Sequence, residues 1–514
     1  MTGRMNSRLF STPALLIALP AGALNVLAFA PFNFWPVQIA TLALLFALVL
    51  RAPSIKSGAL LGWAYGFGWS LCCVYWPYIS MHRYGGMPAW MAGLAVVLLS
   101  LLLGAFAAFG MAGASWLRRR WSAGESIALL LLLPAAWALS EWLRGWVFTG
   151  LPWTASGYAH TASPLAGFAP IAGVYGLGWL AALCAGALAL LPSKKWPAAL
   201  AIVIFAAGFG LHEINWTEAN GQPISVRLLQ GNVPQDQKFE NDRIGSMLAL
   251  YYDMIHAAPA DLIATPETAI PLSVQQLPPD YLPLLKDFAQ KSNSYLALGI
   301  FVHDAPMRYA NSMIGLAPKP AAGVKFYRYD KHHLVPFGEF IPVGFRWFVD
   351  MMHIPLGDQA RGALLQPPFA VKDQWVMPNI CYEDLFGEEI AAQLAASYFS
   401  GTPQATILLN LSNIAWFGDT VVVPQHLQIS QMRALETGRP MLRATNTGAT
   451  AVIDPKGKVI AQLQPFERAV LTATVQGYRG TTPYILFGNT LIVVLSGLML
   501  GAAWLLSRKH CASL

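Results

Sequence analysis

Three side chains of complementary chemistry each follow an apolar, β-like run. Glu267 ends the stretch DLIATPE, Lys331 ends KFYRYDK, and Cys381 lies between QWVMPNI and the acidic segment YEDLFGEE. Such runs are typical of strands that deliver a side chain to their carboxyl edge. A carboxylate can take the proton of a thiol, and a fixed ammonium group stabilises the thiolate and then the oxyanion that forms when sulfur attacks a carbonyl carbon. Together the three residues predict a cysteine nucleophile, with Glu267 as its base and Lys331 as its electrostatic partner.

Each of these residues, taken alone, has an ordinary explanation. A Glu or Lys after a strand is usually a solvated loop charge, and a lone Cys is usually a buried, small apolar residue. Their joint occurrence favours catalysis over three separate structural roles, because their flanks are also rich in polar groups. These flanks are Pro266-Glu267, Asp330-Lys331-His332-His333 and Cys381-Tyr382-Glu383.

The composition of the chain indicates a membrane protein. Of its 514 residues, 55% are hydrophobic and only 11% are charged, whereas soluble domains carry about a quarter charged residues. The positive charge is concentrated in residues 1–213, which hold 11 Lys and Arg against 3 Asp and Glu. The polar region contains no basic cluster interleaved with aromatic residues, so no nucleic-acid partner is expected.

Cysteine usage excludes a disulfide within the polar region, because only one of the five cysteines falls there. No CxxC pair and no His/Cys cluster has the spacing of a zinc site, so we expect no metal and no cofactor. The five are Cys72, Cys73, Cys184, Cys381 and Cys511.

Apolar stretches of the length needed to cross a bilayer recur along the chain. Basic clusters follow every second stretch, and they fall on one side if about eight spans are counted; the positive-inside rule makes that side cytoplasmic. The first stretch ends in Ala28-Phe29-Ala30, which resembles a signal-peptide cleavage site, but Pro31 argues against cleavage and we expect the segment to be retained. The stretches are about 14–30, 35–50, 58–80, 89–115, 126–148, 165–191, 197–212 and 485–506.

The long polar segment alternates strand-like and helix-like patterns. We therefore expect residues 1–213 to form seven transmembrane helices, 214–484 an external α/β domain, and 485–514 an eighth helix with a cytoplasmic tail. Expected strands are 224–229, 261–264, 295–301, 312–316, 374–380 and 405–411, with a hairpin at 449–463. Expected helices are 242–257, 281–292, 388–397 and 425–437.

Four motifs resemble the Glu–Lys–Cys motifs of the nitrilase, or carbon–nitrogen hydrolase, superfamily. They are TPETAIP (265–271), YDKHHLVPFGEF (329–340), NICYED (379–384) and LSNIAWFG (411–418). With the apolar stretches, LRGWVFTGLPW (143–153) and RALETGRP (433–440), the chain resembles the bacterial apolipoprotein N-acyltransferases over essentially its full length. The resemblance implies a polytopic α-helical membrane protein of about eight spans with an inserted, nitrilase-like α-β-β-α sandwich.

The resemblance also implies a reaction. Cys381 would take an acyl chain from the sn-1 position of a phospholipid as a thioester and pass it to the α-amino group of a diacylated apolipoprotein. Glu267 would act as base and then acid, and Lys331 with the Tyr382 amide would hold the oxyanion. Glu339 would orient Lys331 or the amine, with Glu383 and Asn413 in support. A monomer in the bacterial inner membrane, with its catalytic domain on the periplasmic side, is implied.

Further residues are candidates for substrate contact. Within the segment Phe345 to Met352, Trp347 and Phe348 suit a mobile lid that dips into the membrane, although an ordinary core segment is as good an explanation. Phe239 and Trp416 are candidate acyl-chain contacts. The pair Glu141 and Arg144, inside the fifth span, is either functional or, slightly favoured, a structural ion pair.

The chain departs from the family pattern at three places. Thr265 and Phe239 stand where a Trp is frequent, and Ile414 where an Asp is. These departures bear on acyl-chain contacts and on the groups around the triad, not on the triad itself.

Two other functions remain open on the sequence. A membrane-tethered amidase or nitrilase would share the triad and differ in its acceptor. A transporter or receptor would need repeated halves or paired broken helices, which the sequence does not contain, and would keep its function without Cys381.

Overall fold

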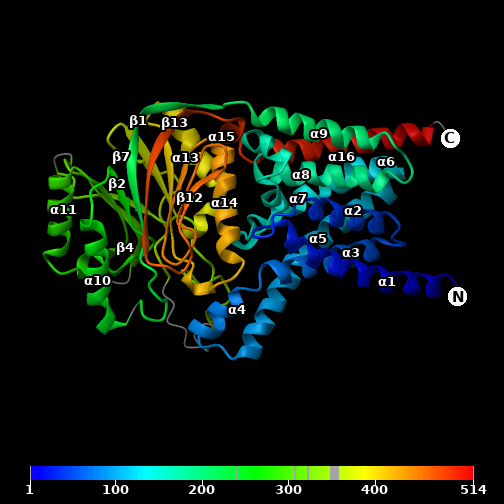
Figure 1. The fold of residues 1–514 in the computed structure, drawn as a ribbon. Helices are drawn as coiled ribbons and strands as arrows, with labels where there is room; N and C mark the ends of the chain where they lie inside the picture. Colours follow the sequence, from blue (N-terminus) through cyan, green and yellow to red (C-terminus); the bar gives the residue numbers. More distant parts are fainter. Residues whose placement is uncertain (1, 239, 306–307, 321–322, 348–357, 513–514) are drawn as a thin grey trace. The chain divides into compact units, whose positions relative to one another are not determined.

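The computed structural model describes residues 2–512 apart from 239, 306–307, 321–322 and 348–357. The chain divides into two compact units (Figure 1). The helical unit comprises Met1–Tyr78, Pro88–Ile214 and Phe487–Leu514, and the sandwich unit comprises Ile79–Met87 and Asn215–Leu486.

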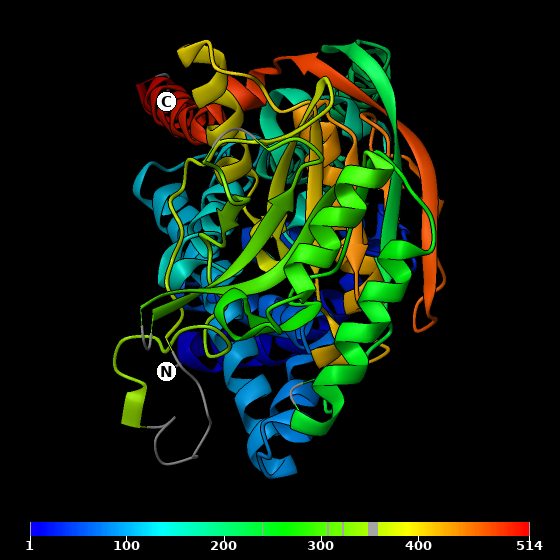
Figure 2. The same cartoon turned by 90° about the vertical axis from the view of Figure 1, so that its left-hand side faces the viewer.

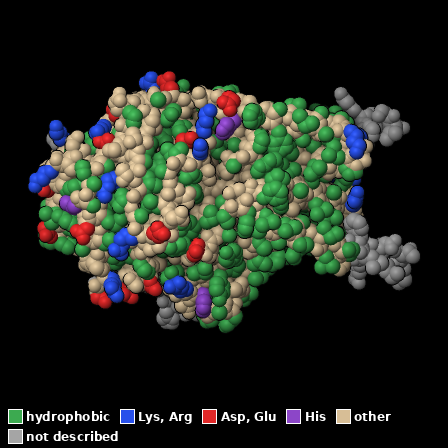
Figure 3. All heavy atoms as spheres, viewed as in Figure 1, with side chains coloured by type: hydrophobic (Ala, Val, Ile, Leu, Met, Phe, Trp, Pro, Cys, Tyr) green, Lys and Arg blue, Asp and Glu red, His purple; other side chains and the backbone are tan. Residues whose placement is uncertain are grey.

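The helical unit is built from long apolar helices, and hydrophobic side chains cover most of its visible face in Figure 3. Among the described residues, four helical stretches are long and apolar enough to cross a membrane: Ala89–Arg120, Glu125–Arg144, Pro164–Leu190 and Thr490–Arg508. Three shorter apolar helices cover Thr12–Ala28, Pro36–Leu50 and Pro197–His212. The count of eight spans therefore stays a prediction. The main helices are α1 (Thr2–Leu24), α2 (Pro36–Leu50), α3 (Ile55–Cys73), α5 (Ala89–Arg120), α7 (Leu133–Arg144), α8 (Ala169–Leu190), α9 (Pro197–His212) and α16 (Thr490–Ala512).

Glycines let two of these helices pack closely. Gly62 and Gly66 lie one turn apart on α3, and a Cβ at these positions would stand 2.6 Å from the Ala107 carbonyl oxygen and 2.8 Å from the Gly104 Cα of α5. Small residues at such spacing are the usual means by which apolar helices approach each other in a bilayer.

The sandwich unit contains two sheets. The first has the order β13-β1-β2-β4-β5-β6, with β3 paired to β4, and the second has the order β12-β11-β10-β9-β8-β7. Strands of the first sheet are β1 (Thr217–Gln230), β2 (Leu262–Ala264), β3 (Ile270–Ser273), β4 (Tyr295–Ala305), β5 (Arg308–Leu316), β6 (Tyr327–Asp330) and β13 (Ala469–Gly480). Those of the second are β7 (Phe369–Val371), β8 (Gln374–Ile380), β9 (Ile407–Ser412), β10 (Met441–Thr445), β11 (Ala451–Ile453) and β12 (Val459–Gln462).

Helices cover the outer faces of both sheets, which gives the predicted α-β-β-α order (Figures 1 and 2). One apolar core lies between the sheets and includes Val226, Ile380 and Leu411. A second core joins the first sheet to the helices on its outer face and includes Leu248 and Leu285. The layer helices are α10 (Asn241–His256), α11 (Tyr281–Ser292), α13 (Gly387–Ser400) and α14 (Val422–Thr437).

A short arm, Ile79–Met87, belongs to the sandwich unit although the chain on either side of it belongs to the helical unit. The Tyr84 hydroxyl donates to the Ala415 carbonyl (3.4 Å), and the Tyr84 ring meets Trp416 edge-on with 5.6 Å between ring centroids. Arg83 lies 3.9 Å from Asp236. The arm therefore rests on two loops of the sandwich, 235–238 and 413–418, a contact that no sequence pattern predicted.

Candidate active site

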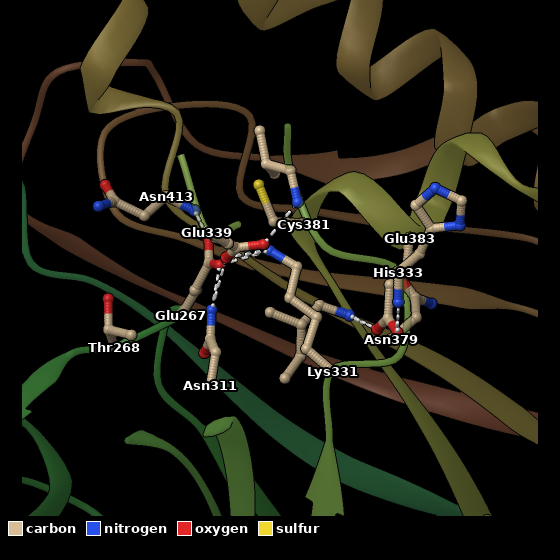
Figure 4. A network of polar contacts seen from close by, with 12 residues as sticks. Glu267, Thr268, Asn311, Lys331, His333, Glu339, Asn379, Cys381, Glu383 and Asn413 are labelled. Atoms are coloured by element: carbon tan, nitrogen blue, oxygen red, sulfur yellow. Dashed lines mark hydrogen bonds and ion pairs between the residues drawn. The ribbon is translucent and has the colours of Figure 1, made fainter. Parts of the chain in front are cut away.

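Glu267, Lys331 and Cys381 come together from the ends of three strands. Lys331 follows β6 and Cys381 follows β8 directly, whereas Glu267 stands in the turn after β2. Figure 4 shows the three side chains pointing toward one another, although β2 and β6 belong to one sheet and β8 to the other. The packing of the two sheets against each other thus places the thiol beside the carboxylate and the amine.

Lys331 forms ion pairs with two carboxylates. Its Nζ lies 3.1 Å from Glu267 Oε1 and 2.7 Å from Glu339 Oε1, and the lysine side chain is 1% exposed. Burial lowers the pKa of the Lys331 amine, but the charges of Glu267 and Glu339 outweigh burial and raise it well above its ordinary value. Lys331 is therefore a permanent cation that cannot act as the base.

Asn311, in β5, orients both carboxylates, and sequence patterns did not single it out. Its Nδ2 donates to Glu267 Oε1 (2.7 Å) and Glu339 Oε1 (3.2 Å), while its carbonyl accepts from the Lys331 amide (2.8 Å). The other Glu267 oxygen, Oε2, accepts from the Asn413 amide (2.9 Å). Glu267 Oε2 keeps a lone pair, so this oxygen suits proton transfer.

Cys381 has a backbone φ of +52°, which a residue with a Cβ adopts rarely. Its carbonyl accepts hydrogen bonds from Asn410 Nδ2 (3.4 Å) and His426 Nε2 (3.3 Å). Burial and the Glu267 charge raise the pKa of the Cys381 thiol to about 12, against the opposing effect of Lys331. The resting group is therefore a neutral thiol, and it becomes a nucleophile when its proton passes to a base.

Glu383 ties the segment after β6 to the end of β8. Its Oε1 accepts from the His332 amide (2.6 Å), and its Oε2 accepts from the Ile380 amide (2.6 Å) and the Tyr329 hydroxyl (3.0 Å). Burial raises the pKa of Glu383 to about 7. Glu383 therefore holds the backbone on either side of the site, next to Lys331 and Cys381.

Asn413 links the site to two further loops. Its Nδ2 donates to Gln235 Oε1 (2.8 Å), and its Oδ1 accepts from Asn446 Nδ2 (3.0 Å). Asn446 also exchanges two hydrogen bonds with the backbone of Val233, at 2.8 and 2.9 Å. Asn413, whose backbone amide donates to Glu267, is therefore held in place by hydrogen bonds to two other loops.

Two family profiles match the chain, one described as "Apolipoprotein N-acyltransferase N-terminal domain" over residues 21–187 and one as "Carbon-nitrogen hydrolase" over residues 225–484. An apolipoprotein N-acyltransferase of Ralstonia nicotianae is 50% identical over 502 residues, covering 96% of this chain and 94% of its own. That of Nitrosomonas europaea is 44% identical and covers 95% and 96%. The chain belongs to the apolipoprotein N-acyltransferase family.

Family membership confirms the resemblance predicted from the motifs, over nearly the whole chain. It also confirms the nitrilase-like fold of the sandwich unit. Among solved structures, a carbon–nitrogen hydrolase from Helicobacter pylori G27 aligns to 49% of this chain and 88% of its own with 17% identity and a TM-score of 0.35.

Of the predicted substrate-contact residues, Phe239 and Phe348 lie outside the described part of the chain. Trp347 is 64% exposed, so an ordinary core position does not explain it, and the lid stays a prediction. Trp416 is 37% exposed and contacts Tyr84.

Glu141 and Arg144 form an ion pair of 3.4 Å within the helical unit. Arg144 donates to the Trp153 carbonyl (2.9 Å), and Glu141 accepts from the amide (2.8 Å) and the hydroxyl of Ser156. Both residues thus hold the loop after α7, which favours the structural reading of the pair.

Tyr382 packs its ring against Phe386 and His333, and the role of its amide as oxyanion donor stays a prediction. Among the described residues, no group of three or more His, Cys, Asp or Glu side chains could hold a metal ion.

Proposed function

We propose that this chain carries an acyl group from the sn-1 position of a phospholipid, through a Cys381 thioester, to the α-amino group of the S-diacylglyceryl-cysteine that begins an apolipoprotein. Its family supports N-acyl transfer, lipid and lipoprotein substrates, and a place in the bacterial inner membrane. The observation that carries the mechanism is the buried Glu267–Lys331–Glu339 cluster beside the thiol of Cys381.

In the first half-reaction, Glu267 takes the thiol proton as sulfur attacks the ester carbonyl carbon. The negative charge that forms on the ester oxygen faces the fixed ammonium of Lys331, which stabilises it without rearrangement. When the tetrahedral intermediate collapses, the carbon–oxygen bond to glycerol breaks and Glu267 returns its proton to the leaving alkoxide. The products are a lysophospholipid and an acyl–Cys381 thioester.

In the second half-reaction, the neutral amine of the lipoprotein attacks the thioester carbon, and Glu267 takes one of its protons. The carbon–sulfur bond then breaks, the amide product leaves, and the proton on Glu267 returns to the thiolate. A thioester is reactive enough to acylate an amine and stable enough to wait for a second bulky substrate. Glu339, paired with Lys331 at 2.7 Å, keeps that cation in place through both steps.

The experiment that tests this function incubates the full-length protein with acyl-labelled phospholipid and reads the Cys381 peptide by mass spectrometry. We expect an acyl adduct that persists with phospholipid alone and disappears when a diacylated lipopeptide with a free amine is added. Cys381→Ala abolishes the adduct, and Glu267→Gln slows its formation about 10²- to 10⁴-fold because general-base catalysis is lost.

Cys72→Ala serves as the matched control, because this cysteine lies in α3 of the helical unit and has no role in the proposal. Discharge of the adduct to water at the same rate with and without the amine would instead favour the membrane-tethered amidase. Normal lipopeptide acylation by Cys381→Ala would exclude the thioester.

A further inference from the structure

A second lysine lies beside Glu267, and the reaction as derived so far does not use it. Lys238, in the loop after β1, is 3% exposed. Its Nζ donates to the Glu267 carbonyl (3.2 Å) and to Thr268 Oγ1 (2.5 Å). A buried ammonium is costly unless it is paired and hydrogen-bonded, so its position next to the base of the site calls for an explanation.

The turn that Lys238 contacts has little conformational freedom. Thr268 has φ of +45°, an unusual value for a residue with a Cβ. The turn also lies against β4 at Gly299, where a Cβ would stand 2.1 Å from the Pro266 carbonyl oxygen. Figure 4 shows Thr268 on the side of Glu267 opposite to Lys331. Lys238 therefore fixes the backbone of Glu267 from the side that Lys331 does not reach.

The loop that carries Lys238 is itself anchored. Gln235 accepts from Asn413 Nδ2 (2.8 Å), and Val233 exchanges two hydrogen bonds with Asn446. Asn413 in turn donates its amide to Glu267 Oε2. The amine of Lys238 and the amide of Asn413 thus belong to one hydrogen-bonded network of loops, and both contact Glu267.

Charge gives Lys238 a second role. Charged groups that act on the Cys381 thiol include Glu267, Glu339, Lys331, Lys238 and the Asp384-paired Arg443. Within this set, Glu267, Glu339 and Lys331 sum to one negative charge, both before and after the thiol proton moves to Glu267, because Asp384 offsets Arg443. Lys238 brings that sum to zero, so the thiolate forms in a neutral site rather than an anionic one.

Lys238 is cationic at neutral pH. Burial lowers the pKa of its amine to about 8, while the charges of Glu267 and Cys381 act in the opposite direction. The Lys238 amine is therefore positively charged below about pH 8 and loses this charge as the pH rises through that value.

We propose that Lys238 is a positioning residue of the acyl transfer, whose ammonium group holds the Glu267 turn and supplies the second positive charge that makes the Cys381 thiolate accessible. This inference rests on the proposed function, in which that thiolate is the nucleophile.

The test measures the rate at which iodoacetamide alkylates Cys381 in the full-length protein in detergent, resolved by peptide mass spectrometry, at pH 7 and pH 9.5. Lys238→Gln keeps a donor for the Glu267 carbonyl but removes the charge. We expect this variant to react about tenfold more slowly than wild type at pH 7, because an opposite charge nearby shifts a pKa by about one unit or more. The rates should converge at pH 9.5, where the wild-type amine is neutral too.

Lys238→Arg, which keeps its charge at both pH values, should match wild type at pH 7 and exceed it at pH 9.5. Alkylation of Cys72 in the same samples normalises reagent and pH. Equal rates for Lys238→Gln and wild type at pH 7 would overturn the proposal, and so would an equal slowing at both pH values, which is the mark of a merely structural role.

The assay needs neither phospholipid nor lipopeptide. A failed result for Lys238 would therefore leave the acyl-adduct experiment intact, and a missing adduct would not alter the alkylation rates.

Discussion

The strained backbone of Cys381 depends on a histidine that no motif indicated. Arg443 Nη2 donates to His426 Nδ1 (3.2 Å), and because a guanidinium can only donate, Nδ1 is the acceptor. The proton therefore sits on Nε2, which donates to the Cys381 carbonyl (3.3 Å). Burial and the Arg443 charge hold the pKa of His426 well below its usual range, so the imidazole stays neutral. His426 acts through the cysteine backbone and is a positioning residue.

We expect His426→Phe to lower the free energy of unfolding by about 1–3 kcal/mol, because the Cys381 carbonyl and Arg443 each lose a buried partner. Acyl-adduct formation should slow more than stability alone explains, since the Cys381 carbonyl would then keep only the longer hydrogen bond from Asn410. The measurements are thermal unfolding in detergent and the adduct assay.

His256→Phe is the matched control, because His256 lies in α10, donates to the Tyr252 carbonyl of its own helix, and contacts the rings of Tyr252 and Phe288, away from the motifs of the site. Unchanged adduct kinetics in His426→Phe would show that the cysteine needs no such support.

Sequence patterns predicted the reactive residues that directly follow strands. They did not predict the residues that hold these reactive side chains in place. Glu267, Lys331 and Cys381 stand out because each is polar and follows an apolar run. Asn311 and His426 do not, because they lie inside β5 and α14, where a polar residue is read as part of a regular element. Only the pairing of β5 with β6 and the packing of α14 beside the nucleophile show what they contact.

Among the elements, β4 shows how a missing side chain shapes the site. Gly299 lies within β4 and faces the turn that carries Glu267, where a Cβ would meet the Pro266 carbonyl at 2.1 Å and the Thr268 amide at 2.8 Å. These are backbone atoms in a turn that Lys238 and Asn413 hold, so they cannot move aside without moving the base.

Gly299→Ala should therefore reduce the rate of adduct formation about 10²-fold, because displacing a catalytic group by about 1 Å costs that much. Binding of phospholipid should change less than the rate. Gly245→Ala is the control: this glycine lies in α10 with open space around its Cβ position, and alanine there should stabilise by about 0.5–1 kcal/mol. Wild-type rates for Gly299→Ala would mean that the turn is freer than its contacts indicate.

Some of the apolar, buried strands were predictable. The run 374–380 coincides with β8, and the helix predicted at 281–292 coincides with α11, which is capped by Asn293 with φ of +54°. By contrast, β13 was missed because its half-exposed pattern, with Thr472, Thr474 and Gln476, resembles a loop until it pairs with β1. Long-range pairing, not local preference, makes it a strand.

For the whole molecule, the distribution of basic residues predicts which parts face the cytoplasm. Arg118-Arg119-Arg120 end α5 and should lie inside, while the sandwich unit should lie on the periplasmic side. In a background in which all five native cysteines are replaced, Ser246→Cys on α10 should react with a membrane-impermeant maleimide in spheroplasts. Ser122→Cys should react only after the membrane is permeabilised. The reverse pattern would contradict both the eight-span count and the periplasmic site.

The arm of residues 79–87 also limits how the molecule can be divided. A fragment of residues 215–486 would lack the arm, because the arm comes earlier in the sequence. Such a fragment is the obvious design for a water-soluble form of the sandwich unit, yet it would be incomplete. Trp416 would lose the ring of Tyr84, and Asp236 would lose Arg83, beside the loop that bears Lys238. Truncation would thus remove contacts from the two loops that carry Lys238 and Asn413, and we expect adduct formation by the fragment to be slower than by the full chain.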